Sequence, residues 1–92
     1  MKKIIFLYWE TCPYCMQAKR AIKELLNENP EYNDVVIEKI ETRLKKEEAA
    51  KYQRTYVPCI YTEQEKAYEA TPGESYEECK EGIKKAFESA LV

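Results

Sequence analysis

Residues 11–15 read Thr-Cys-Pro-Tyr-Cys and hold the residue types most suited to chemistry in this chain. If a helix begins here, the sulfurs of Cys12 and Cys15 lie about one turn apart, within reach of each other. Such a pair of thiols can pass reversibly between a dithiol and a disulfide. The spacing therefore predicts a redox-active dithiol, in which Cys12 attacks a substrate disulfide and Cys15 then resolves the mixed disulfide.

Two cysteines three positions apart are also typical of half a zinc site, or of a pair of small buried residues. A tetrahedral zinc site usually needs four ligands, and its second half is poorly supplied in this chain. The sequence holds no histidine, and Cys59 and Cys79 lie twenty positions apart rather than in a second close pair. We therefore favour the redox interpretation and keep a metal-binding or cluster-binding module as the alternative from another class.

The elements on either side of the dithiol place it at a strand-to-helix junction. Residues 4–9 are all apolar or aromatic, which predicts a strand buried on both faces. Apolar residues spaced by three or four positions then predict a helix over residues 13–27. Pro13 suits the first helical position, so Cys12 becomes the N-cap residue. There the positive end of the helix dipole favours a thiolate on Cys12.

Strand and helix patterns alternate along the rest of the chain. In order, they predict a strand over residues 35–40, a helix over 43–52 with Thr42 as N-cap, strands over 56–61 and 66–70, and a helix from Tyr76 to the C-terminus. A strand, a helix and a strand in close succession form a βαβ unit, whose two strands are parallel. The order β-α-β-α-β-β-α therefore predicts an α/β fold in one domain over residues 1–92.

Composition and charge exclude several classes of function. The 92 residues suffice for one core, and 15 basic against 17 acidic residues leave a net charge of −2. Without a strong positive field, we expect neither nucleic acid nor an anionic membrane as a partner. The start Met-Lys-Lys followed by apolar residues suggests a signal peptide, but Glu10 stops the apolar run before any cleavage-like site. We expect a cytoplasmic monomer, in which a close cysteine pair is catalytic rather than part of a secreted disulfide framework.

Three features together resemble the glutaredoxin family: Cys-Pro-Tyr-Cys after a first strand, Val57-Pro58 further along the chain, and a glycine-containing turn before a final helix. The resemblance covers nearly the whole chain. It implies a thioredoxin-like fold, with a four-stranded mixed sheet flanked by three helices. The activity it implies is thiol–disulfide exchange, which reduces protein or low-molecular-weight disulfides without a bound prosthetic group.

The resemblance also implies which residues contact a substrate. Pro58 matches a proline that is cis in the family and lies opposite the dithiol, and Val57 before it offers its backbone N–H and C=O to an extended substrate. The alternative is a trans proline that only begins an edge strand. Tyr14, between the two thiols, is expected to stay exposed beside Cys12 and to pack against the bound molecule. Simple exposure without a role is the alternative for this tyrosine.

Glutathione is the reducing co-substrate that the family implies, but its site departs from the family pattern. Trp9 stands where the family commonly has lysine, and Tyr56 stands where it commonly has threonine. The family's Gly-Gly and following aspartate are represented only by a turn in which Gly73, Glu74 and Ser75 would bind it. Without the cation at this position, and with a carboxylate near an anionic ligand, we expect weak or no dependence on glutathione. The alternative is that Lys51 or Arg54 supplies the missing positive charge for the ligand's carboxylate. The reductant is then another thiol protein or a flavoprotein, as for a thioredoxin-like electron donor to a dedicated partner.

Other side chains near these elements allow more than one interpretation. Trp9 either covers the dithiol or fills core space at the end of the first strand. Cys59, directly after the proline, is either a third redox thiol or, as we favour, a small buried hydrophobic residue. Cys79 lies on the apolar stripe of the last helix and is interpreted as core. A purely structural interaction domain is the last alternative, and replacement of Cys12 without loss of any activity would favour it.

Overall fold

The computed structural model describes residues 2–63 and 65–92. Its elements, in chain order, are β1 (Lys3–Tyr8), α1 (Pro13–Glu28), the 3-10 helix η1 (Pro30–Asp34), β2 (Val36–Glu41), α2 (Lys46–Ala49), β3 (Cys59–Tyr61), β4 (Lys66–Glu69) and α3 (Tyr76–Leu91). The strand-to-helix junction predicted at the dithiol is therefore present. β1 ends shortly before Cys12, and α1 begins directly after it.

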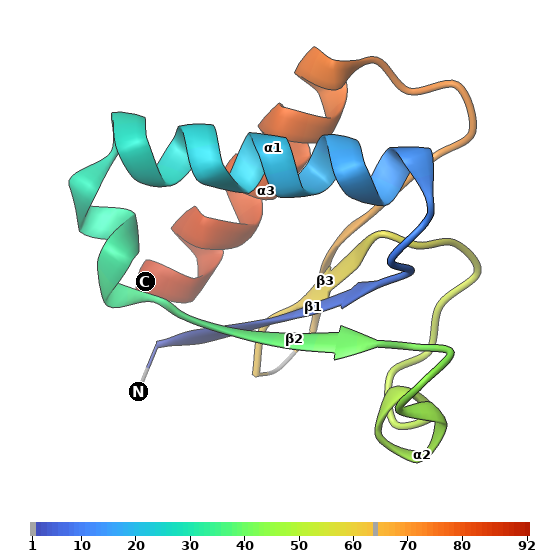
Figure 1. The fold of residues 1–92 in the computed structure, drawn as a ribbon. Helices are drawn as coiled ribbons and strands as arrows, with labels where there is room; N and C mark the ends of the chain where they lie inside the picture. The colour runs from blue at the N-terminus through green and yellow to red at the C-terminus, as the bar shows by residue number, and fades with distance from the viewer. Residues whose placement is uncertain (1, 64) are drawn as a thin grey trace.

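The strands form one mixed sheet with the order β2-β1-β3-β4. β1 is parallel to β2 and antiparallel to β3, and β3 is antiparallel to β4. Figure 1 shows α1 and α3 together on one face of the sheet, with α2 on the opposite side, past the end of β2. Within the described residues, the predicted βαβ unit and the α/β fold of a four-stranded mixed sheet with three α-helices are confirmed.

Alternate residues of β1 point into two separate cores, because successive side chains of a strand face opposite sides of the sheet. Ile4 and Phe6 are fully buried in the larger apolar cluster, together with residues of α1 and α3. Ile5 and Leu7 face the other side, in a smaller cluster beside α2. The prediction of a strand buried on both faces is confirmed. Packing on both faces makes the end of β1 a fixed support for the loop that carries the dithiol.

The second helix is shorter than predicted. α2 covers only Lys46–Ala49, and Thr42 is not its N-cap, so both predictions for this segment are wrong. The side chains of residues 43–48 are exposed, and burial of Ala49 alone gives little energy to stabilise a longer helix. The chain instead turns at Glu41, whose backbone C=O accepts the amides of the residues three and four positions further on.

The third strand also begins later than predicted, at Cys59 rather than at Tyr56. The amides of Thr55 and Tyr56 bond to the carboxylate of Glu69, so they are not available for a β ladder. Residues 54–58 therefore form an irregular segment that leads into β3. This segment forms one wall of the candidate site.

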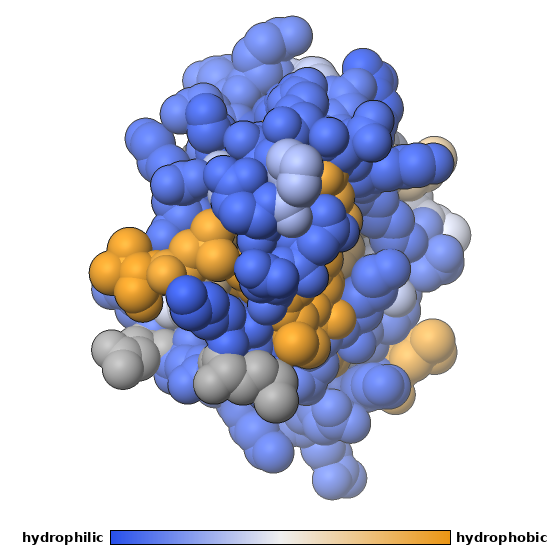
Figure 2. Space-filling model, turned by 90° about the vertical axis from the view of Figure 1, so that its left-hand side faces the viewer, coloured by the Kyte–Doolittle hydropathy of each residue, from blue (hydrophilic) through white to orange (hydrophobic). Residues whose placement is uncertain are grey.

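Hydrophilic side chains cover most of the side of the molecule that carries both chain ends. Figure 2 shows this side, where apolar side chains are visible as narrow patches between hydrophilic ones. Large apolar side chains that are exposed include Trp9 and Tyr56, in the loop before α1 and the segment before β3. Within residues 2–63 and 65–92, every helix is too short or too polar to span a membrane.

Candidate active site

Cys12 and Cys15 lie at the start of α1, as the sequence predicts. Cys12 is the N-cap residue, with an extended backbone (φ −81°, ψ 127°), and Pro13 opens the helix. Cys12 is partly exposed, whereas Cys15 is fully buried, and both are free thiols. The accessible sulfur therefore belongs to Cys12 and sits at the positive end of the helix dipole, a location that suits the nucleophile of disulfide exchange.

The backbone of Trp9 contacts both cysteines. Its N–H donates a hydrogen bond to Cys15 Sγ at 3.2 Å, and its C=O accepts one from the N–H of Cys12 at 3.4 Å. Burial raises the pKa of Cys15 to about 12, the Trp9 amide opposes this rise, and the neighbouring Cys12 thiol adds to it. Cys15 is therefore protonated at neutral pH, and the Trp9 amide is a group that favours its ionisation.

A cleft of about 340 Å³ lies beside Cys12. One wall comes from the loop before α1 and the other from the segment before β3, and the lining residues are Trp9, Cys12, Arg54, Thr55, Tyr56 and Val57. Trp9 is 41% exposed and Tyr56 is 47% exposed, so both rings present apolar surface there. The fold thus brings together Cys12, Tyr56 and Val57, three of the predicted site residues from distant parts of the sequence.

The wall that faces the dithiol loop across the cleft is shaped by Pro58 and Glu69. The peptide bond before Pro58 is cis, as the resemblance implied. The carboxylate of Glu69 accepts the amide of Thr55 at 2.6 Å and that of Tyr56 at 2.8 Å. Burial raises the pKa of Glu69, but these amides and the Lys66 ammonium outweigh burial, so the pKa is lowered overall.

The other wall of the cleft is the loop before α1, which leads into the dithiol and is called the dithiol wall. Glu41, at the end of β2, holds this wall in a similar way. Its buried carboxylate accepts the amide of Glu10 at 2.7 Å and the amide of Arg43 at 2.8 Å. These hydrogen bonds keep the pKa of Glu41 below the usual value for glutamate. Sequence analysis missed both Glu41 and Glu69, since a lone glutamate near the end of a strand gives no signal of partners that are distant in sequence.

The turn expected to bind glutathione is already bonded within the protein. Gly73, with φ of 82°, donates its N–H to the hydroxyl oxygen of Tyr14 at 2.8 Å. The Glu74 carboxylate accepts a hydrogen bond from the hydroxyl of Tyr68, a buried residue, and Ser75 is the N-cap of α3 in a capping box. Tyr14 is therefore half-buried against this turn rather than freely exposed, and the Glu74 carboxylate is turned towards Tyr68 of β4.

Comparison with models of known protein families matches residues 2–66 to Glutaredoxin. The chain belongs to the glutaredoxin family. A solved structure described as that of a malarial protein has a TM-score of 0.62 and 14% identity, over 90% of this chain and 93% of that one. The germline-specific thioredoxin Deadhead from Drosophila melanogaster has a TM-score of 0.59 and 15% identity, over 90% of this chain and 78% of that one.

The family match and the likeness to solved structures support different conclusions about this chain. At identities of 14% and 15%, the likeness to the two solved structures shows the thioredoxin-like fold alone. No curated protein matches the chain. Membership of the glutaredoxin family supports thiol–disulfide oxidoreductase chemistry in general, and the dithiol at the start of α1 is where that chemistry is expected.

The other two cysteines of this glutaredoxin-family chain are core residues. Cys59 is fully buried in the small cluster beside α2, and burial raises its pKa to about 12. Cys79 is fully buried in the larger cluster, where its sulfur lies 3.2 Å from the hydroxyl oxygen of Tyr68, within hydrogen-bond distance. Neither residue lines the cleft, and the burial of both agrees with their interpretation as small core side chains. Whether Cys59 also forms a disulfide with Cys12 or Cys15 is a question for mass analysis of the oxidised protein.

Trp9 lies at the cleft rather than in the core. The guanidinium carbon of Arg43 is 5.1 Å from the centre of the Trp9 ring. The same guanidinium donates a hydrogen bond to Thr11 Oγ1 at 3.1 Å. Of the two interpretations of Trp9, core filling is wrong, because the ring is 41% exposed and lines the cleft together with Cys12, beside the Arg43 cation.

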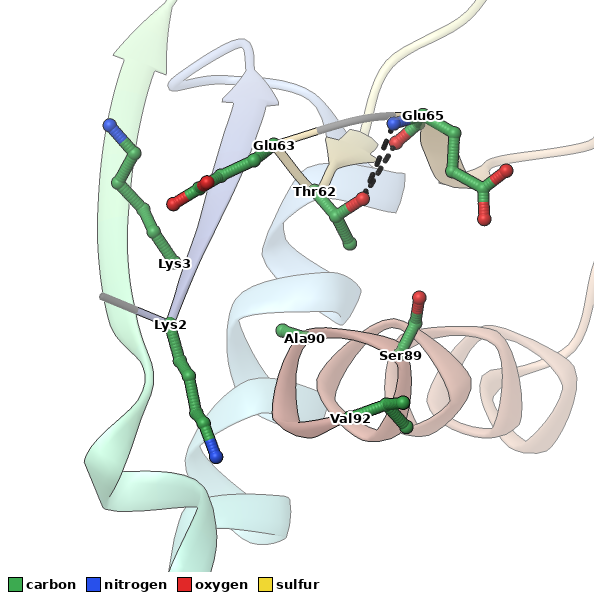
Figure 3. A pocket seen from close by; sticks show the side chains of 8 residues that line it. All are labelled: Lys2, Lys3, Thr62, Glu63, Glu65, Ser89, Ala90 and Val92. Carbon is green, nitrogen blue, oxygen red and sulfur yellow. Dashed lines mark hydrogen bonds between the residues drawn. The ribbon is translucent and has the colours of Figure 1, made fainter.

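A second hollow, of about 350 Å³, lies at the opposite end of β1. Figure 3 shows that the side chains of Lys2 and Lys3, at the start of β1, point in opposite directions. Both ammonium groups already bond to the protein, one to a backbone carbonyl and one to a carboxylate, and no cysteine lines this hollow. Among residues 2–63 and 65–92, no three His, Cys, Asp or Glu side chains are grouped to hold a metal ion. The candidate site therefore remains the cleft beside Cys12.

Proposed function

We propose that this chain is a dithiol oxidoreductase that reduces disulfides of proteins or small molecules through Cys12 and Cys15. One observation carries the proposal: a partly exposed thiol at a cleft is the N-cap of a helix whose first turn holds a second, buried thiol. Family membership supports thiol–disulfide exchange in general. The two sulfurs together supply the two electrons that reduce one disulfide.

The first step takes place at Cys12. Its thiolate attacks one sulfur of the substrate disulfide, which forms a mixed disulfide and releases the other substrate sulfur as a thiolate that takes up a proton. Cys12 lines the cleft at the start of α1, where an incoming disulfide can reach its sulfur.

The second step takes place at Cys15. Its thiol loses a proton, and its sulfur attacks the Cys12 sulfur of the mixed disulfide. The Cys12–Cys15 disulfide forms, and the second substrate sulfur leaves as a thiolate and is protonated. Because burial raises the pKa of Cys15, its thiolate is scarce at neutral pH. This step is therefore sensitive to every group that contacts the Cys15 sulfur.

The second wall of the cleft supports binding of an extended substrate segment. In the described part of the chain, the backbone N–H and C=O of Val57 have no hydrogen-bond partner. An extended peptide can lie along such a segment and bind it through backbone hydrogen bonds. The exposed rings of Trp9 and Tyr56 offer apolar contacts on either side. The preferred substrate is therefore a disulfide in an accessible, extended protein segment.

Several contacts support a reductant other than glutathione. The Gly73 amide is bound by Tyr14, the Glu74 carboxylate faces the fold, and Ser75 serves as a helix cap. The position where the family commonly has a lysine carries Trp9. A thiol protein or a flavoprotein is therefore the proposed electron donor, as in a thioredoxin-like carrier.

Replacement of each cysteine tests the dithiol mechanism. Cys12→Ser is expected to abolish reduction of a protein disulfide by dithiothreitol-regenerated enzyme, because the attacking sulfur is lost. Cys15→Ser is expected to accumulate a covalent mixed disulfide on Cys12, which mass spectrometry of the intact protein detects. Cys59→Ala is the matched control and should retain activity. Full activity of Cys12→Ser would contradict the proposal, and stoichiometric metal or visible colour in the purified protein would favour the metal- or cluster-binding alternative.

The electron donor is tested separately with the wild-type protein. Oxidised enzyme is mixed with glutathione or with a thioredoxin-reductase-type flavoprotein, and the return of the Cys12–Cys15 dithiol is followed by thiol labelling. We expect faster reduction by the flavoprotein. Turnover of a mixed glutathione disulfide with glutathione at ordinary glutaredoxin rates would contradict this part of the proposal, while leaving the dithiol mechanism in place.

A further inference from the structure

Glu41 binds the peptide unit just before the dithiol. Its Oε2 accepts the N–H of Glu10 at 2.7 Å, and its Oε1 accepts the N–H of Arg43 at 2.8 Å. The side chain is only 8% exposed, so these hydrogen bonds lie where little water competes for them. In the β1–β2 ladder Glu41 is opposite Tyr8, at the strand end from which the dithiol loop departs.

The same peptide unit also contacts Cys12. The N–H of Glu10 and the C=O of Trp9 belong to one planar peptide. Glu41 accepts the N–H of this peptide, and the C=O of the same peptide, which belongs to Trp9, accepts the N–H of Cys12 at 3.4 Å. Rotation of the plane would break both hydrogen bonds. The Glu41 carboxylate therefore fixes the orientation of the loop immediately before Cys12.

The preceding amide contacts the other cysteine. The N–H of Trp9 donates to Cys15 Sγ at 3.2 Å and lowers the pKa that burial has raised. This N–H and the plane held by Glu41 meet at the Cα of Trp9, so loosening of the plane displaces the N–H as well. Arg43 adds a second tie to the same loop, because its guanidinium donates to Thr11 Oγ1 at 3.1 Å.

We propose that Glu41 is a positioning residue for the dithiol, which holds the Trp9 amide against the sulfur of Cys15 and so speeds the resolving step. Glu41 acts through the backbone of the loop and not on the reacting sulfurs themselves. The inference rests on the proposed function, since it assigns a residue to the second step of that reaction.

Dithiobis(nitrobenzoate), an aromatic disulfide, separates the two steps in one experiment. Cys12 attacks the reagent and releases one nitrothiobenzoate ion, which leaves the other half bound to Cys12 as a mixed disulfide. Cys15 then attacks the Cys12 sulfur, gives its proton to water, forms the Cys12–Cys15 disulfide and releases a second ion. Each release is coloured, so stopped-flow absorbance gives both rates.

Glu41→Gln is expected to slow the second release by about threefold or more, while the first changes by less than about twofold. Each oxygen of the Glu41 carboxylate accepts one of the two amides. The glutamine side chain has an NH2 group in place of one oxygen, so one of the amides faces a donor instead of an acceptor. If weakening of the Trp9 contact raises the pKa of Cys15 by about one unit, about tenfold less thiolate is present. A thiolate of higher pKa is also a stronger nucleophile, which regains about threefold of the lost rate. A slowing of about threefold therefore remains.

Two further variants give the test its controls. Glu38→Gln changes a glutamate on the same strand that pairs with Lys3 at the surface, so both rates should be unchanged. Glu41→Asp keeps the charge but shortens the side chain by one methylene, so the second release should be slow here too. It also carries the test if Glu41→Gln does not fold. Trp9 is the single tryptophan, and its fluorescence should shift in both Glu41 variants but not in Glu38→Gln.

The outcomes distinguish the inference from the proposed function. Equal second-release rates in the folded wild type and both Glu41 variants would overturn the inference, even if the variants unfold at lower temperature. Equal slowing of both releases would overturn it as well, since the effect would not be specific to Cys15. A wild-type protein that releases only one ion per chain would overturn the proposed function itself, because no second thiol would then resolve the mixed disulfide.

Discussion

Each wall of the cleft is held by a glutamate carboxylate that accepts backbone amides, but the two walls present different groups to the cleft. On the dithiol wall, the buried carboxylate of Glu41 accepts two backbone amides, and the backbone of Trp9 is bonded to both cysteines. On the other wall, Glu69 also accepts two amides and pairs with Lys66 at 2.9 Å, but its side chain is 21% exposed. There the backbone of Val57 has no partner in the described part of the chain.

Under the proposed function, the difference lets one cleft serve both reaction and recognition. Exchange between two sulfurs needs them held in place, whereas recognition of an extended peptide needs backbone groups that are still free. A carboxylate at a strand end allows both, because it binds neighbouring amides without adding a strand to the sheet. Glu41 thereby fixes the sulfurs, while Glu69 shapes the second wall and leaves one residue of it open.

Among the predictions for the two walls, loosening the second wall is expected to give the largest effect, a loss of folding stability. Glu69→Gln replaces the charged acceptor of the Thr55 and Tyr56 amides with a neutral one and removes the ion pair with Lys66. Hydrogen bonds to charged groups contribute more than neutral ones, so the free energy of unfolding should fall by about 1–3 kcal/mol. Urea denaturation at pH 7 measures it, with Glu81→Gln as an exposed control. No change in Glu69→Gln would mean that the wall is held by other contacts.

The same variant has a pH signature. Because the pKa of Glu69 is lowered in the folded protein, its stabilisation is present above the unfolded pKa of about 4.3 and is lost as the pH falls through the folded pKa. The stability of the wild type should therefore fall more steeply than that of Glu69→Gln below about pH 5. Parallel curves for the two proteins would contradict this assignment.

Removing the apolar ring of the second wall should have a smaller effect, confined to recognition. Tyr56→Ala is expected to raise KM for a peptide disulfide by about tenfold, as expected for loss of about 1.4 kcal/mol of contact energy. The value of kcat should change little, because the dithiol wall is intact. Leu44→Ala, which truncates a side chain that is 81% exposed and outside the cleft, is the control. A fall in kcat with KM unchanged would place Tyr56 in the reaction rather than in binding.

The smallest effect is expected at the contact between Tyr14 and Gly73. Tyr14→Phe frees the Gly73 amide to meet water or a ligand and should change stability by less than about 1 kcal/mol. Reduction of the oxidised enzyme by glutathione should become faster by up to about threefold, because one competing acceptor is removed. The rate with the flavoprotein should be unchanged. A slower reaction with glutathione would mean that the tyrosine hydroxyl supports this reductant rather than competing with it.

The order of the elements and the place of the dithiol could be predicted from the sequence because both depend on local patterns. The apolar run before residue 9, Pro13 after Cys12, and the apolar stripe that contains Cys79 each act within one or two turns of chain. The start of β3 and the length of α2 could not be predicted in this way. β3 begins late because Glu69, from the next strand, binds the amides before it. α2 is short because the chain turns at Glu41 and little of the segment is buried.

The sequence by itself therefore determined a strand, a helix and a Cys-x-x-Cys at their junction, since propensity, capping and hydrophobic period are properties of neighbouring residues. Only the tertiary structure decided which sulfur is accessible and which segment faces it across the cleft. It also decided that Glu41 and Glu69 hold the two walls. Hydrogen bonds between residues far apart in the chain depend on how the strands are aligned in the sheet, and no local pattern encodes that alignment.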